Sequence, residues 1–132
     1  VEMTQDRYVA LYGQDSLVHT NHFLSRDLLT HDLRERDLAL RGGTSTIVRY
    51  NRMRKLLDRN YGNIDKSKLK EFISDHVNYP ESICRHSVDS RSAQTIAAFI
   101  MDPAEGKVLV ADGNPCQARY YEYSIEEQIN SK

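Results

Sequence analysis

The densest group of side chains capable of chemistry lies near the start of the chain, in the stretch LVHTNHFLS from Leu17 to Ser25. His19 and His22 carry ring nitrogens that can bind a metal. Between them, Asn21 has an amide that can cap a helix or close a turn. On a rigid support, the same amide can donate hydrogen bonds to the oxyanion formed in acyl transfer. These residue types alone leave every one of these interpretations open.

A metal site is the first alternative for the histidines. On a strand, residues three apart point to opposite faces, so His19 and His22 are expected to be structural or surface histidines. Further zinc donors are present, namely His31, His76, His86, Cys84 and Cys116. Their pattern has low specificity for zinc, so we expect no metal and no cofactor, while a zinc-binding module stays open as a minor alternative.

Cys84 is followed by Arg85 and His86, and this positive setting would lower a thiol pKa, as a reactive cysteine requires. The sequence places no acid or amide to orient it, so a simple buried cysteine is the expectation. The group from Gly42 to Ser45 precedes a predicted helix whose amides could hold an anion. It lacks the phosphate-loop pattern, which favours a plain capped turn.

The elements that must position these residues are read from periodicity and turns. Two β-prone runs, residues 7–12 and 16–20, predict a hairpin. Residues 25–42 are expected to form a loop with one or two short helical turns. A helix capped by Thr44 or Ser45 should then run to about Asn60.

A second helix is predicted to be capped by Asp65 and to run through Val77, which places His76 in the apolar core. The final third predicts an antiparallel hairpin over residues 95–111, followed by a third strand in the run ARYYEYSI. Strands that pair with one another, with helices grouped between them in sequence, indicate an α+β fold with an antiparallel sheet.

Composition narrows the class of protein. The 132 residues carry a net charge of −1, which argues against a nucleic-acid or anionic-membrane partner, and no apolar run reaches the roughly 18 residues of a membrane span. Two cysteines are too few for a disulfide framework, so both are expected to be free thiols in an intracellular, cytoplasmic protein. Ser131-Lys132 lacks the final Leu of a peroxisomal address, so that location requires a longer chain.

Five segments in a fixed order carry a family resemblance. They are HTNHF (19–23), RYNRMRKLL (49–57), ESICRH (81–86), TIAAFIMDPAEGKVLVADGNPC (95–116) and the closing RYYEY. Together they resemble the C-terminal part of the acyl-coenzyme A:6-aminopenicillanic acid acyltransferase family, which are cysteine N-terminal-nucleophile hydrolases. The resemblance spans nearly the whole chain, and the Thr-Asn-His-Phe, Ile-Cys-Arg-His and Gly-Asn-Pro-Cys blocks are its most specific parts.

The resemblance implies an amide hydrolase or acyltransferase whose precursor cuts itself in front of a cysteine. That cysteine attacks an amide or thioester, and its freed α-amino group acts as the base. The family's oxyanion asparagine corresponds to Asn21, and its active-site arginine corresponds to Arg85, a rigid fork of donors. His19, His22 and Cys84 are then expected to support the site or contact the substrate.

The nucleophile is expected upstream, because neither Cys84 nor Cys116 lies near an N-terminus. Residues 1–132 should therefore be a single C-terminal segment of a larger, autoprocessed enzyme domain with a four-layer αββα fold, and inactive alone. The expected partners are the upstream segment of the same precursor and a small-molecule amide or acyl thioester. The alternative is a non-catalytic structural or interaction domain that retains the family fold.

Overall fold

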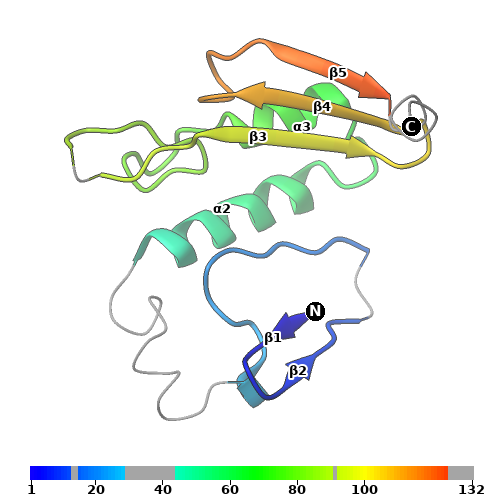
Figure 1. Ribbon diagram of the computed structural model, residues 1–132, viewed down its shortest axis with the longest axis vertical. Coiled ribbons are helices and arrows are strands. Elements are labelled where there is room, and N and C mark those ends of the chain that lie inside the picture. The colour runs from blue at the N-terminus through cyan, green and yellow to red at the C-terminus, as the bar shows by residue number, and fades with distance from the viewer. Residues whose placement is uncertain (13–14, 29–43, 91, 125–132) are drawn as a thin grey trace. The chain divides into compact units, whose positions relative to one another are not determined.

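The computed structural model describes residues 1–12, 15–28, 44–90 and 92–124. The chain divides into two compact units, Val1–Arg59 and Asn60–Lys132, and each is described by itself (Figure 1). The prediction that residues 1–132 form one segment of a larger domain concerns the longer protein, and it stays a prediction.

The first unit begins with a short antiparallel pair. Strand β1 (Glu2–Met3) pairs with β2 (Tyr8–Val9), with Glu2 opposite Val9. The predicted hairpin between residues 7–12 and 16–20 is wrong, since residues 16–20 form no strand. Tyr8 and Val9 instead pair with the upstream residues Glu2 and Met3, so the first predicted run forms its hydrogen bonds with the start of the chain.

A 3-10 helix, η1 (Arg26–Leu28), confirms a short helical turn within residues 25–42, and the rest of that prediction lies outside the described residues. The long helix α2 (Thr44–Arg59) confirms the predicted one. Thr44 and Ser45 lie inside its first turn rather than before it. No helix of the described chain is long and apolar enough to cross a bilayer.

The second unit opens with α3 (Lys66–Ile73), whose predicted N-cap is confirmed: Asp65 accepts from Lys68 N at 2.7 Å. The helix ends at Ile73 rather than Val77. The Asp75 carboxylate accepts from Val77 N at 3.0 Å, an interaction that replaces a helical hydrogen bond. His76 is therefore exposed in the following turn, and its predicted place in the core is wrong.

The sheet of the second unit confirms the three predicted strands. Strands β3 (Ala97–Asp102), β4 (Lys107–Asp112) and β5 (Tyr120–Ser124) pair antiparallel in the order β3-β4-β5. The β3–β4 turn contains Gly106 at φ +61°, a backbone conformation that glycine adopts without strain. Two helices with antiparallel sheets confirm the predicted α+β class.

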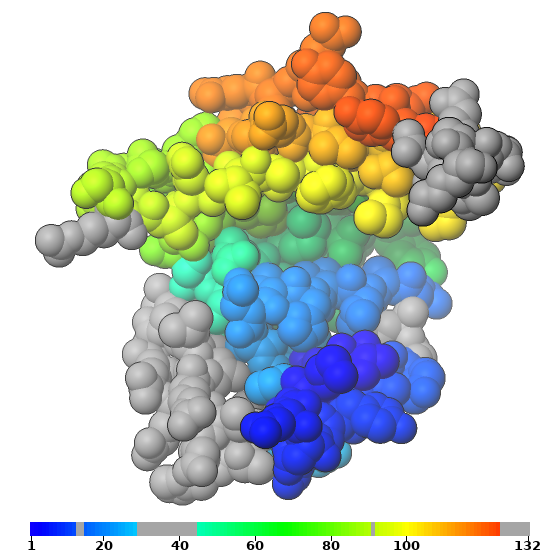
Figure 2. Space-filling model, viewed as in Figure 1, coloured from blue at the N-terminus to red at the C-terminus, as the bar shows by residue number. Residues whose placement is uncertain are grey.

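The two faces of this sheet differ. Side chains on one face are buried, and α3 contacts β3 on that unit's covered side, where Phe72 is 1% exposed. Alternate residues on the other face are large, apolar and exposed, and Figure 2 shows side chains of β3, β4 and β5 at the surface. The buried set is Ile100, Leu109 and Ala111, and the exposed set is Phe99, Met101, Tyr121 and Tyr123. One face of the sheet therefore lacks a cover within this unit.

Truncation of Phe72 tests the core of the second unit. Phe72→Ala should lower the free energy of unfolding by about 3 to 5 kcal/mol, because a buried aromatic ring is lost and a cavity is left. Urea unfolding measures this. Glu71→Ala is the matched control, since this neighbour on α3 is exposed, and its loss should be much smaller. Equal losses in the two variants would contradict the assigned core.

Candidate active site

Asn21 is held by two residues of helix α2. Its backbone N–H donates to Thr46 Oγ1 at 2.9 Å, and its side-chain Oδ1 accepts from Arg49 Nη2 at 2.7 Å. Thr46 and Arg49 are three residues apart, so they lie on neighbouring turns of one helix face. One helix therefore fixes both the backbone and the amide of Asn21.

The Arg49 contact determines what the amide can do. A guanidinium only donates, so the Asn21 oxygen must face it and the Nδ2 group must point elsewhere. No described residue accepts a hydrogen bond from Nδ2, and Asn21 is exposed. A hydrogen bond from a cation to the amide oxygen polarises the amide and strengthens its N–H donors. Such an oriented donor is what an oxyanion requires.

Thr46 Oγ1 is the centre of a polar cluster beneath Asn21. It lies 2.8 Å from Thr20 Oγ1 and 2.8 Å from His22 Nδ1, and Thr46 is only 2% exposed. The His22 ring also meets Tyr50 edge-on, with ring centroids 5.5 Å apart. His22 thus lies beside the support of Asn21, and its role as a supporting residue stays a prediction.

Glu2 anchors the stretch at its other end. Its carboxylate accepts from Leu24 N at 2.5 Å, from Ser25 N at 2.9 Å and from His19 Nε2 at 2.8 Å. Burial raises the pKa of Glu2, but the two backbone donors and His19 outweigh this and hold the pKa below its ordinary value. His19 and His22 thus have separate partners and do not converge on a metal.

Arg85 belongs to the second unit, where neighbouring loops fix its backbone. Its N–H donates to Thr95 Oγ1 at 2.9 Å, and its carbonyl accepts from Asn114 Nδ2 at 2.6 Å. The guanidinium lies 3.6 Å from the Glu81 carboxylate, while Nε is buried with no partner among the described residues. A buried donor without an acceptor is costly, so Nε suits a bound polar group.

Cys84 is fully buried, and its Sγ lies 3.6 Å from Cys116 Sγ, too far for a disulfide. Burial raises the pKa of the Cys116 thiol, and Cys84 raises it further, so Cys116 is not activated as a nucleophile. Cys116 Sγ also lies near His86 Nε2. The convergence of these side chains was not predicted, because their sequence spacing is irregular.

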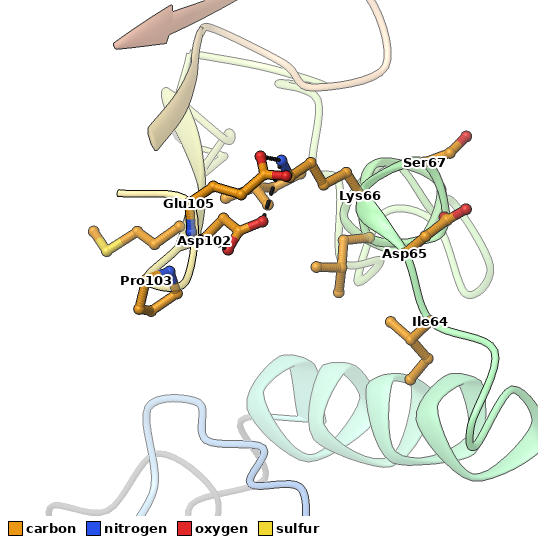
Figure 3. A pocket seen from close by; sticks show the side chains of 10 residues that line it. Ile64, Asp65, Lys66, Ser67, Asp102, Pro103 and Glu105 are labelled. Carbon is orange, nitrogen blue, oxygen red and sulfur yellow. Dashed lines mark hydrogen bonds and ion pairs between the residues drawn. The ribbon is translucent and has the colours of Figure 1, made fainter. Parts of the chain in front are cut away.

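The pocket of the second unit contains none of the predicted site residues. It has a volume of about 510 Å³ and lies between the start of α3 and the β3–β4 turn (Figure 3). Lys66 reaches across it to Asp102 at 3.1 Å and to Glu105. Lys66 is therefore paired with two carboxylates, and the three side chains bind one another across the pocket.

Thr46 and Arg49 were missed as site residues. Both lie within the predicted helix, where an arginine or a threonine is an ordinary residue and gives no local signal of a functional site.

Substitution of Glu2 tests the anchor. Glu2→Gln keeps an acceptor but removes the charge, so the free energy of unfolding near pH 7 should fall by about 2 kcal/mol, the size of a charged hydrogen bond. Because folding lowers the Glu2 pKa below 4.5, this stability is present above that pH and is lost as pH falls through the folded-state pKa.

Urea unfolding of both proteins at a series of pH values measures the difference, which should shrink in acid. Glu122→Gln, at an exposed carboxylate, is the matched control and should show no comparable difference. A gap between wild type and Glu2→Gln that stays constant across the acidic range would remove Glu2 as the anchor.

The comparisons with known proteins identify the family of the chain. The family model described as acyl-coenzyme A:6-aminopenicillanic acid acyl-transferase matches residues 1–117, and the search of curated proteins found no match. The matched range contains Asn21, Arg85 and both cysteines. The family's name points to acyltransferase or hydrolase activity. The chain belongs to the acyl-coenzyme A:6-aminopenicillanic acid acyltransferase family.

Proposed function

We propose that this chain forms the oxyanion-stabilising part of an amide hydrolase or acyltransferase that works through a cysteine acyl-enzyme. The observation that carries the proposal is the orientation of the Asn21 amide, whose oxygen is held by Arg49 while Nδ2 stays available. An amide without a fixed orientation would stabilise the oxyanion less, because electrostatic stabilisation depends on donors that are oriented before the reaction begins.

The proposed reaction starts at a cysteine upstream of residue 1. Its thiolate attacks the carbonyl carbon of an amide or acyl thioester, and the negative charge that develops on the oxygen is stabilised by Asn21 Nδ2. The α-amino group accepts the thiol proton when the thiolate forms and then, as an ammonium group, gives that proton to the leaving amine or thiol, while the acyl group stays on sulfur. Water or an amine then accepts it. Arg85 would bind a polar group of the substrate.

The exposed face of the sheet supports a partner segment. A soluble unit rarely leaves aromatic residues such as Phe99, which is 59% exposed, and Tyr121 uncovered on one contiguous face. With α3 on the opposite face, a second sheet packed here would give the order helix, sheet, sheet, helix. We propose that the upstream segment of the precursor provides that sheet and completes a four-layer αββα domain.

The proposed location is intracellular, cytoplasmic or peroxisomal. It is supported by the two cysteines, whose sulfurs lie near each other without forming a disulfide.

Replacement of Asn21 tests the oxyanion role. Asn21→Ala in the full-length protein should lower turnover of an amide or thioester substrate by about 10² to 10³, the usual effect of losing one oxyanion donor. Steady-state kinetics gives the number, and circular dichroism checks that the variant is folded. Asn51→Ala, at an exposed position of α2, is the matched control and should keep turnover near that of wild type. Near-normal turnover in Asn21→Ala would remove the assignment.

Intact mass tests the proposed processing. Full-length protein should separate under denaturing conditions into two chains, the larger beginning with cysteine, because the freed amino group is needed as the base. Substitution of that cysteine should leave a single, uncut chain. A wild-type protein that stays uncut would instead favour the non-catalytic alternative, a structural or interaction domain with the family fold.

A further inference from the structure

Four potential metal-binding side chains meet in the second unit. They are His76, Cys84, His86 and Cys116, and their donor atoms all lie within 4.8 Å of one another. His76 comes from the turn after α3, Cys84 and His86 from the loop before β3, and Cys116 from the turn between β4 and β5. Two connections, the one from α3 to β3 and the one from β4 to β5, therefore bring two nitrogens and two sulfurs to one point.

Four of the six separations between the donor atoms are close to those around a tetrahedral zinc ion, and the other two, from His76 Nε2 to the two sulfurs, lie within 4.8 Å. Zinc binds sulfur at about 2.3 Å and imidazole nitrogen at about 2.0–2.1 Å, so tetrahedral ligands lie about 3.8 Å apart for two sulfurs, about 3.3 Å for two nitrogens and about 3.6 Å for a mixed pair. The observed separations are 3.6 Å between the sulfurs and 3.0 Å between the Nε2 atoms. His86 Nε2 lies 3.8 Å from Cys84 Sγ and 3.3 Å from Cys116 Sγ.

Hydrogen bonding alone does not account for this cluster. An imidazole nitrogen carries either one proton or one lone pair, so it makes one good hydrogen bond. His86 Nε2 nevertheless has three polar neighbours, His76 Nε2 and both cysteine sulfurs. A single cation at the centre would bind one lone pair from each of the four groups and would explain why all four point inward.

The surroundings of Cys84 resemble those of a metal-bound thiolate. Asn114 Nδ2 lies 3.8 Å from Cys84 Sγ and donates to the Arg85 carbonyl at 2.6 Å. The Cys84 backbone is tied to Asp75 O through a 3.0 Å hydrogen bond and to Ser82 through its carbonyl. Polar groups of this kind orient the ligands of a metal and tune its binding.

We propose that His76, Cys84, His86 and Cys116 bind one structural zinc ion. Binding replaces the two thiol protons, which leave to solvent, so two thiolates and two neutral imidazoles balance the charge of Zn²⁺. With four protein ligands the site is closed and has no open position for water, which is typical of structural zinc. Arg85 lies between two ligands in sequence, so the ion would also fix the loop that presents its guanidinium.

Metal analysis of the full-length protein tests the site. Protein purified without chelator should contain about one equivalent of zinc per chain, and X-ray absorption at the zinc edge should show about two sulfur ligands at about 2.3 Å. Exchange for cobalt(II) should give intense visible bands of a tetrahedral thiolate complex. No metal, metal without sulfur ligands, or a Cys84–Cys116 disulfide by mass spectrometry would each overturn the proposal.

Two substitutions complete the test. Cys116→Ser should reduce bound zinc at least about tenfold after dialysis against a chelator, because one thiolate is lost. Asn114→Ala, which keeps all four ligands, should weaken zinc binding by about 10- to 100-fold. His19→Gln is the matched control, a histidine outside the cluster, and should keep its zinc. The wild-type measurements decide the question even where a variant does not fold, and they do not depend on the acyltransferase activity.

Discussion

Burial of the Glu2 carboxylate is the constraint on which the first unit depends. A charge removed from water must be saturated with donors, and here Leu24, Ser25 and His19 provide them. Two of these donors are main-chain groups, so satisfying the carboxylate also determines the path of residues 19–25. The Asn21 amide lies on that path, and Thr46 and Arg49 then fix its orientation. An acid at one end of the stretch and a helix at the other leave the amide little freedom.

In the second unit, different groups hold the segment that carries Arg85. Cys84 is buried there, and hydrogen bonds with Thr95 and Asn114 hold the backbone of the next residue, Arg85. A zinc ion would join the α3–β3 and β4–β5 connections at one point, which is how small, loop-rich regions gain order without additional buried surface.

Local sequence patterns predicted most of the helices and strands, and two of the predictions were wrong. Helix α2, the Asp65 cap and strands β3 to β5 follow from periodicity and turn residues that lie close together in sequence. The predicted N-terminal hairpin is wrong because Tyr8–Val9 pair with Glu2–Met3, a strand of two residues that is too short to give a periodic signal. The predicted end of α3 is also wrong. The apolar spacing continues to Val77, but the Asp75 carboxylate accepts from Val77 N, and this hydrogen bond replaces a helical one.

For the site, the residue types and the family resemblance pointed to Asn21 and Arg85, but not to what holds them. The Asn21–Arg49 contact crosses 28 positions, and the four zinc donors come from two connections that are separated by strands β3 and β4. Such convergence depends on the complete fold. Spacing along the chain could therefore suggest the asparagine as a donor but could not show that its amide is oriented.

The β3-β4-β5 sheet joins strands that follow one another directly along the chain. Sheets with such short sequence separation close quickly, because little loop entropy is lost before their contacts form. During synthesis the proposed partner segment would leave the ribosome first, since N-terminal parts emerge and fold first. The exposed aromatic face would then form when the proposed partner segment has already folded. That face would be exposed to other nascent chains only for a short time.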